Sequence, residues 1–174
     1  MWRPLLALVL VVVVAAPVAA SKAPKPGADI DIDAIIASMS VEEKVGQLLM
    51  IGFGGTEVTP HIEHWVKTRG AGGIALFSRN IVDFEQTARF ARQLHSLTEG
   101  QLPVFLSLDQ EGGNVVRVKD GALVLPGNMA LGATRSTTLA YVAGQALAID
   151  LRRLGFNMNL APVLAVNSNP KNPV

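Results

Sequence analysis

The sequence predicts an α/β fold in which short parallel strands alternate with amphipathic helices. Apolar runs at 48–53, 73–77 and 103–108 have the length of strands, and a fourth strand is expected at 156–160. The segments between these runs repeat apolar residues at helical spacing. Parallel strands need crossover connections, which helices usually supply. Two closures fit this order: an open doubly wound sheet, or the N-terminal half of a (β/α)8 TIM-type barrel with about four parallel strands.

Helix starts are marked by side chains that can cap an N-terminus. The run 48–53 is expected to be buried on both faces of its sheet, and a long connection, 109–135, is expected after the third strand. The predicted caps are Asp31 or Asp33, Ser40, Thr59, Asp83, and Thr137 or Thr138. The last helix carries an apolar stripe, expected to be buried, at Leu139, Val142, Ala143, Ala146, Leu147, Leu151 and Leu154.

The composition of the 174 residues argues against several classes of protein. Lys and Arg number 15 against 14 Asp and Glu, so the chain lacks the positive charge typical of a nucleic-acid-binding protein. It has no cysteine, which excludes disulfides, thiolate metal sites and a cysteine nucleophile.

His61, His64 and His95 fall on predicted helices rather than at strand ends, and we expect them to be solvated surface residues, not metal ligands. The turn at 52–55 lacks the glycine spacing of dinucleotide-binding proteins.

The N-terminus has the three-part pattern of a secretory signal peptide. Arg3 precedes twelve uninterrupted apolar residues, 5–16, and small residues follow at 17–20. Twelve helical residues span about 18 Å, too short for a bilayer core of about 30 Å. We therefore expect a cleaved signal peptide at 1–20, a linker at 21–30 and an incomplete barrel domain at 31–174. The mature protein is expected to be secreted or periplasmic, without a stable membrane span.

The segment after the third strand carries the most informative polar residues. Asp109, Gln110 and Glu111 precede two glycines, and Arg117 lies eight residues after Asp109. In parallel α/β folds, functional side chains gather at the carboxyl ends of strands. A carboxylate there can accept hydrogen bonds from two neighbouring sugar hydroxyls, while a guanidinium binds the ligand or the carboxylate. The alternative is structural, with Asp109 capping a turn and Glu111 paired with Arg117 at the surface.

Five segments of the sequence resemble family 3 glycoside hydrolases, and most of all their bacterial β-N-acetylglucosaminidase (β-N-acetylhexosaminidase) branch. The resemblance extends over roughly 40–174, although Asn114 and Ala165 stand where many relatives have Arg and Asp. The matching segments are 43–53, 72–80, 109–113, 125–133 and 157–163.

This resemblance implies a (β/α)8-type barrel and retaining hydrolysis of terminal β-linked N-acetylglucosamine, from peptidoglycan fragments or chitin-type oligosaccharides. It implies no metal and no cofactor. Asp109 matches the family's substrate-binding aspartate, and Arg117 matches a substrate-binding arginine on the same loop. The family's acid/base histidine and aspartate nucleophile belong to later segments, so no residue of 1–174 is assigned a catalytic role. The expectation is the N-terminal part of a longer enzyme, inactive by itself.

Two other functions fit parts of the sequence. A non-catalytic carbohydrate-binding protein would keep Asp109 and Arg117 without the chemistry. An enzyme acting on a phosphorylated ligand would need a glycine-rich phosphate loop before a helix, and the sequence has no such loop.

Overall fold

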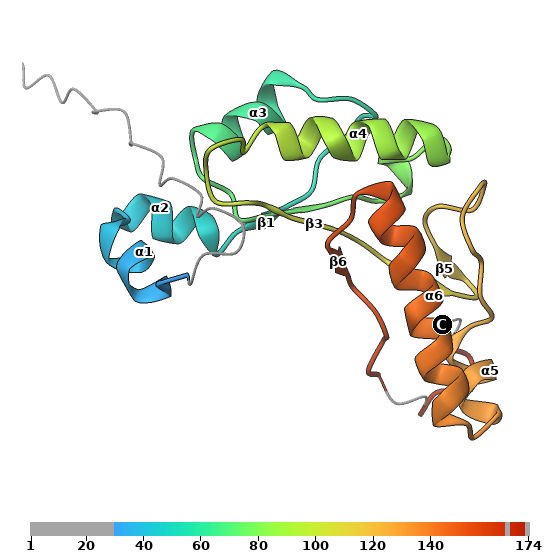
Figure 1. Cartoon of the computed structure of the whole chain (residues 1–174). Helices are drawn as coiled ribbons and strands as arrows, with labels where there is room; N and C mark the ends of the chain where they lie inside the picture. The colour runs from blue at the N-terminus through green and yellow to red at the C-terminus, as the bar shows by residue number, and fades with distance from the viewer. Residues whose placement is uncertain (1–29, 166–167, 173–174) are drawn as a thin grey trace, which may run out of the picture.

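The structure, a computed structural model, describes residues 30–165 and 168–172 (Figure 1). The predicted signal peptide and most of the predicted linker lie outside the described residues. Within the described ranges, no helix is both long and apolar enough to cross a membrane. The helical segments are α1 (Ile32–Ser38), α2 (Val41–Gln47), α3 (Pro60–Lys67), the 3-10 turn η1 (Ser78–Asn80), α4 (Phe84–Ser96), α5 (Asn128–Ala133) and α6 (Thr137–Leu154).

A parallel sheet lies at the centre of the fold, as predicted. Its strands are β1 (Met50–Ile51), β2 (Gly73–Ala75), β3 (Phe105–Leu108) and β6 (Met158–Asn159), in the order β1-β2-β3-β6. All three neighbouring pairs are parallel. The strands are shorter than the apolar runs that predicted them, because regular pairing covers only two to four residues of each run.

Side-chain caps begin the helices where the sequence predicts them. The Asp31 carboxylate accepts the Ala34 N–H at 2.9 Å. Ser40 forms the full capping box of α2. Thr59 caps α3 by accepting the Ile62 N–H, and Asp83 caps α4 by accepting the Gln86 N–H. The predicted cap of α6 is wrong by one residue, because Ser136 rather than Thr137 or Thr138 accepts the Leu139 N–H.

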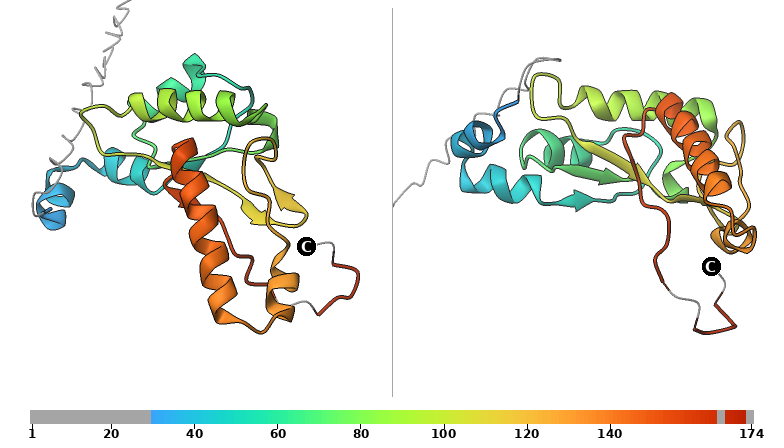
Figure 2. Two further views of the ribbon diagram at one scale, coloured as in Figure 1. Left: turned by 45° about the vertical axis from the view of Figure 1, so that its right-hand side comes forward. Right: turned by 60° about the horizontal axis from the view of Figure 1, so that its bottom comes forward.

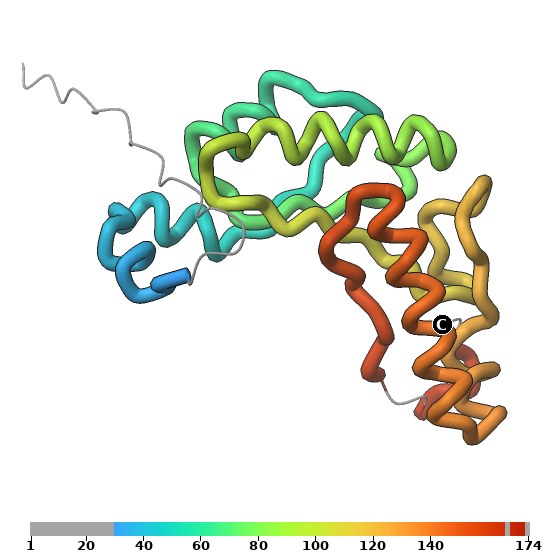
Figure 3. Tube along the Cα trace, in the orientation of Figure 1, coloured from blue at the N-terminus to red at the C-terminus, as the bar shows by residue number. Residues whose placement is uncertain are grey.

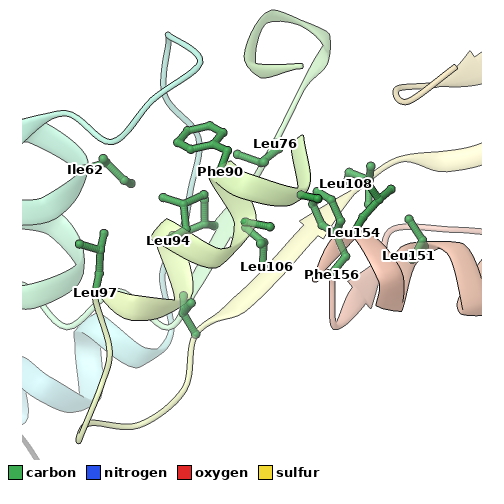
Figure 4. Packing of buried hydrophobic residues seen from close by; sticks show 14 of the residues in the cluster. Ile62, Leu76, Phe90, Leu94, Leu97, Leu106, Leu108, Leu151, Leu154 and Phe156 are labelled. Carbon is green, nitrogen blue, oxygen red and sulfur yellow. The ribbon is translucent and has the colours of Figure 1, made fainter. Parts of the chain in front are cut away.

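Helices α3 and α4 lie side by side on one face of the sheet, and the core is between them and the strands (Figures 1 and 4). Leu106 of β3 is fully buried there. The opposite face of the sheet lacks such cover in the described part of the chain, so Phe105 is 58% exposed and Met50 41% exposed. The prediction that 48–53 is buried on both faces is therefore wrong, since a parallel strand is buried twice only where helices or other strands cover both faces.

Helix α6 packs against the core only near its C-terminal end. Leu151 and Leu154 are buried against the sheet, whereas the N-terminal part of the helix extends away from it beside α5 (Figures 2 and 3). Leu139 and Val142 are half exposed, so the predicted buried stripe is wrong for them. Three other residues of the stripe, Ala143, Leu147 and Leu151, line a hollow of about 820 Å³.

The connection 109–135 is more ordered than the sequence predicts. It contains a two-stranded antiparallel hairpin, β4 (Gln110–Gly112) with β5 (Val115–Val116), followed by helix α5. The hairpin begins immediately after the carboxyl end of β3, and therefore carries the polar residues singled out above.

Candidate sugar-binding site

Asp109 and Arg117 form an ion pair at the carboxyl end of β3. The Arg117 Nη2 lies 2.6 Å from Asp109 Oδ2, and its Nε donates to the same oxygen at 3.2 Å. Both side chains are partly open to solvent, at 22% for Asp109 and 25% for Arg117. Within the described residues, Oδ1 of Asp109 has no hydrogen-bond partner, which leaves it able to accept from a ligand.

The turn of the hairpin requires glycine at position 112. Gly112 has φ +97°, in the left-handed region that favours glycine, and Gly113 has φ +58°. A Cβ on Gly112 would lie 2.7 Å from the carbonyl oxygens of Leu125 and Pro126. The hairpin is thus pressed against the segment before α5, and the Gly113 N–H donates to the Leu125 carbonyl at 2.9 Å. This contact fixes the hairpin that carries Arg117 at its end.

Glu111 does not pair with Arg117, so that alternative is wrong. Its Oε2 accepts the Asn128 side-chain N–H at 3.0 Å and the Val163 backbone N–H at 2.9 Å. Glu111 therefore joins the hairpin to α5 and to the segment after β6.

Gln110 and Asn159 belong to the site, and sequence reasoning assigned neither a role. Gln110 is 2% exposed, and its side chain bonds to the backbone of Arg117 and Val118. The Asn159 side chain bonds to both backbone groups of Gln110, each at 3.0 Å. A polar residue inside an otherwise buried strand end is the signal that could have indicated such a role.

The residues after β2 serve to hold the loop that follows β1. Asn80 is fully buried, and its side chain accepts the Phe77 N–H and donates to the carbonyls of Phe53 and Gly55. Arg79 donates to the same Phe53 carbonyl at 2.9 Å and lies 4.5 Å from the Phe77 ring centre. The polar side chains of Arg79 and Asn80 at the end of β2 are therefore bonded within the protein.

The histidines lie away from this site. His61 and His64 are exposed on α3 as predicted. His95 is not a solvated surface residue: it is half-buried, and its Nε2 lies 2.7 Å from the Gly155 carbonyl, which joins α4 to the end of α6. Over the ranges 30–165 and 168–172, no three His, Asp or Glu side chains gather in a way that could hold a metal ion.

The hollow beside α6 and the ion pair are different places. The hollow of about 820 Å³ is lined by residues of α5, α6 and the segment 156–162, and includes Glu111, but neither Asp109 nor Arg117. Arg117 instead borders a smaller depression of about 240 Å³ beside Asp83, Lys119 and Asp120. The ion pair brings polar groups together, whereas the lining of the hollow is mostly apolar.

Comparison with known proteins gives one consistent family. The model of the glycosyl hydrolase family 3 N-terminal domain matches residues 40–174. The chain is 36% identical over 126 residues to beta-hexosaminidase A of Pseudoalteromonas piscicida, covering 68% of this chain and 21% of that protein. It is 36% identical over 122 residues to a beta-hexosaminidase of Thiobacillus denitrificans, covering 67% of this chain and 33% of that one. The chain thus spans between a fifth and a third of the length of these curated relatives.

Solved structures agree with the sequence comparisons. A family 3 β-N-acetylglucosaminidase from Paenibacillus superposes with a TM-score of 0.73 at 42% identity, covering 79% of this chain and 26% of that one. A β-N-acetylhexosaminidase from Beutenbergia cavernae gives a TM-score of 0.64 at 30% identity, covering 72% and 38%. The predicted fold class is thereby confirmed: the four parallel strands are part of a TIM-type barrel rather than of a doubly wound sheet.

Proposed function

The chain belongs to glycosyl hydrolase family 3, and from this membership we propose that it supplies the sugar-binding part of a β-N-acetylhexosaminidase active site. The proposed reaction is retaining hydrolysis of terminal β-linked N-acetylglucosamine, from peptidoglycan fragments or chitin-type oligosaccharides. The names of the relatives support the substrate class, and the ion pair at the end of β3 supports the place where the sugar binds.

The observation that carries this proposal is the arrangement of Asp109 and Arg117. Arg117 holds one carboxylate oxygen of Asp109, and the other oxygen has no partner in the described part of the chain. A carboxylate fixed in this way accepts hydrogen bonds from hydroxyl groups without having to be reoriented. Neighbouring hydroxyls of a pyranose ring are ligands of that chemistry.

Neither carboxylate of the hairpin is proposed to be catalytic. Retaining glycosidases need a nucleophile and a separate acid/base at the scissile bond, and where both are carboxyl groups they lie about 5 Å apart. Asp109 is paired with Arg117, and Glu111 is bonded to Asn128 and Val163. The relatives extend well past the matched part, and we propose that both reacting groups come from that further part of the barrel.

Sugar binding by the chain is tested by saturation-transfer NMR with N-acetylglucosamine and its β-linked dimer. We expect binding that Asp109→Asn weakens about 10- to 100-fold, the loss for one or two charge-assisted hydrogen bonds. Glu63→Gln is the matched control, because it breaks an exposed ion pair with Lys67 on α3. If Asp109→Asn and the parent chain bind the sugar equally well, the sugar does not bind at Asp109.

A second candidate function is carbohydrate binding without catalysis, which is favoured because Asp109 and Glu111 are both bonded to other protein groups. Hydrolysis of 4-nitrophenyl N-acetyl-β-glucosaminide distinguishes it from the proposed enzyme. The chain 21–174 alone is expected to release no nitrophenol. A chimera in which residues 40–165 replace the matching segment of the Paenibacillus enzyme should release it, and should lose activity with Asp109→Asn. An inactive but folded chimera that still binds the sugar would favour the binding protein.

The predicted signal peptide extends the proposal to the protein's location. We propose that the protein is exported, to the periplasm or the medium, after cleavage between Ala20 and Ser21. N-terminal sequencing of the protein recovered outside the cytoplasm should begin at Ser21, and a cytoplasmic protein that keeps Met1 would contradict export.

A further inference from the structure

The position of Arg117 is not set by the strand pairing of its own hairpin. The ladder between β4 and β5 pairs Gln110 with Val116 and ends there, and its register is irregular. Arg117 is the next residue, beyond the last paired position. Its backbone therefore needs another partner if the guanidinium is to meet Asp109 in one geometry.

The Gln110 side chain supplies that partner. Its Oε1 accepts the N–H groups of Arg117 at 3.0 Å and Val118 at 3.1 Å, and its Nε2 donates to the Val118 carbonyl at 2.8 Å. All three bonds reach the two residues just beyond the ladder. Gln110 is 2% exposed and Val118 is fully buried, so water does not compete for these bonds.

Asn159 holds Gln110 from the other side. Its Oδ1 accepts the Gln110 N–H and its Nδ2 donates to the Gln110 carbonyl, both at 3.0 Å. Asn159 itself pairs with Leu108 in the parallel ladder of β3 and β6. The main sheet is thus connected through Asn159 to the Gln110 backbone, and through the Gln110 side chain to Arg117.

We propose that Gln110 is a positioning residue, which together with Asn159 holds the Arg117 guanidinium on the Asp109 carboxylate in the geometry that binds the sugar. The sugar-binding role rests on the proposed function, whereas the effect on the ion pair does not. A purely structural glutamine would affect the stability of the hairpin and leave the ion pair intact wherever the protein still folds.

The test uses the full chain and two readouts. The first is the Nε–H signal of Arg117 in a proton–nitrogen NMR spectrum, which reports its hydrogen bond to Asp109 and needs no sugar. In Gln110→Met, of similar size but without the three bonds, the signal should move to the position of a free guanidinium. Gln93→Met, the same change at an exposed position of α4, is the control and should leave the signal unchanged.

The second readout is affinity for the dimer of N-acetylglucosamine, expected to fall about tenfold or more in Gln110→Met. An unchanged Arg117 signal in folded Gln110→Met would overturn the positioning role. If the parent chain binds no sugar while Gln110→Met still frees the Arg117 signal, the proposed function fails and the positioning of the ion pair stands.

A second variant decides the matter if Gln110→Met does not fold. Asn159→Leu keeps the Gln110 side chain and removes the two bonds by which Asn159 holds the Gln110 backbone. The Arg117 signal should then move toward the position of a free guanidinium. An unchanged Arg117 signal in the folded Asn159→Leu chain would overturn the proposal, because the connection from the main sheet to Arg117 runs through those two bonds.

Discussion

Replacing glycine by alanine should have opposite effects at two positions of this fold. At Gly112 the backbone has φ +97°, which costs an L-residue about 1–2 kcal/mol. The new methyl group would also lie 2.7 Å from two carbonyl oxygens, of Leu125 and Pro126, and overpacking against backbone costs about 1–3 kcal/mol. We expect Gly112→Ala to lower the free energy of unfolding by about 2–5 kcal/mol. For a chain of this size the melting temperature should fall by about 4–20 °C.

At Gly144, in the middle of α6, the same methyl group would meet no atom within 4 Å. Alanine loses less conformational entropy than glycine in a helix, so Gly144→Ala should stabilise by about 0.5–1 kcal/mol. Thermal unfolding followed by circular dichroism measures both changes. A Gly112→Ala chain as stable as the parent would show that the hairpin does not press on the segment before α5, and would refute the account of how the hairpin is held.

Three further substitutions test the core and the site by thermal or urea unfolding. Leu106→Ala should cost about 2–5 kcal/mol, whereas Phe105→Ala, next to it but 58% exposed, should cost much less, and equal losses would contradict the one-sided burial of the sheet. Asn80→Ala should cost about 2–3 kcal/mol, because it leaves buried backbone groups unsatisfied, and a neutral change would contradict its bonding role. Asp109→Asn should change stability by about 1 kcal/mol or less, since the ion pair is partly solvated, so a large loss would mean that its effect on sugar binding is only unfolding.

Local chemistry explains what the sequence predicted well. The caps at Asp31, Ser40, Thr59 and Asp83 were predictable because each is decided within four residues of chain. The order of strands and helices was predictable for a similar reason, since apolar runs and helical spacing are local patterns. The positive φ of Gly112 follows the same logic of a turn rich in glycine.

Contacts between distant segments explain what the sequence did not predict. The partner of Arg117 could not be chosen between Asp109 and Glu111 from spacing, because Glu111 is bonded to Asn128 and Val163, which lie 17 and 52 residues away. The hairpin was missed because its strands are two or three residues long and lack apolar alternation. The role of Asn159 depends on a contact 49 residues away in sequence, which no local pattern contains.

The N-terminal helices are attached to the rest of the molecule almost entirely through backbone. No residue of α1 is buried, and Gly46 is the one buried residue of α2. The Gly46 carbonyl accepts the Gly72 N–H at 3.0 Å, and a side chain at 46 would collide with the chain at Arg69 and Gly70. Gln47 adds a side-chain bond, with its Nε2 donating to the Gly70 carbonyl at 2.9 Å. Residues 30–45 are therefore attached through the short segment 46–47. A label or fusion placed ahead of residue 45 would leave the packing of the sheet untouched, while a side chain at 46 would press directly on that attachment.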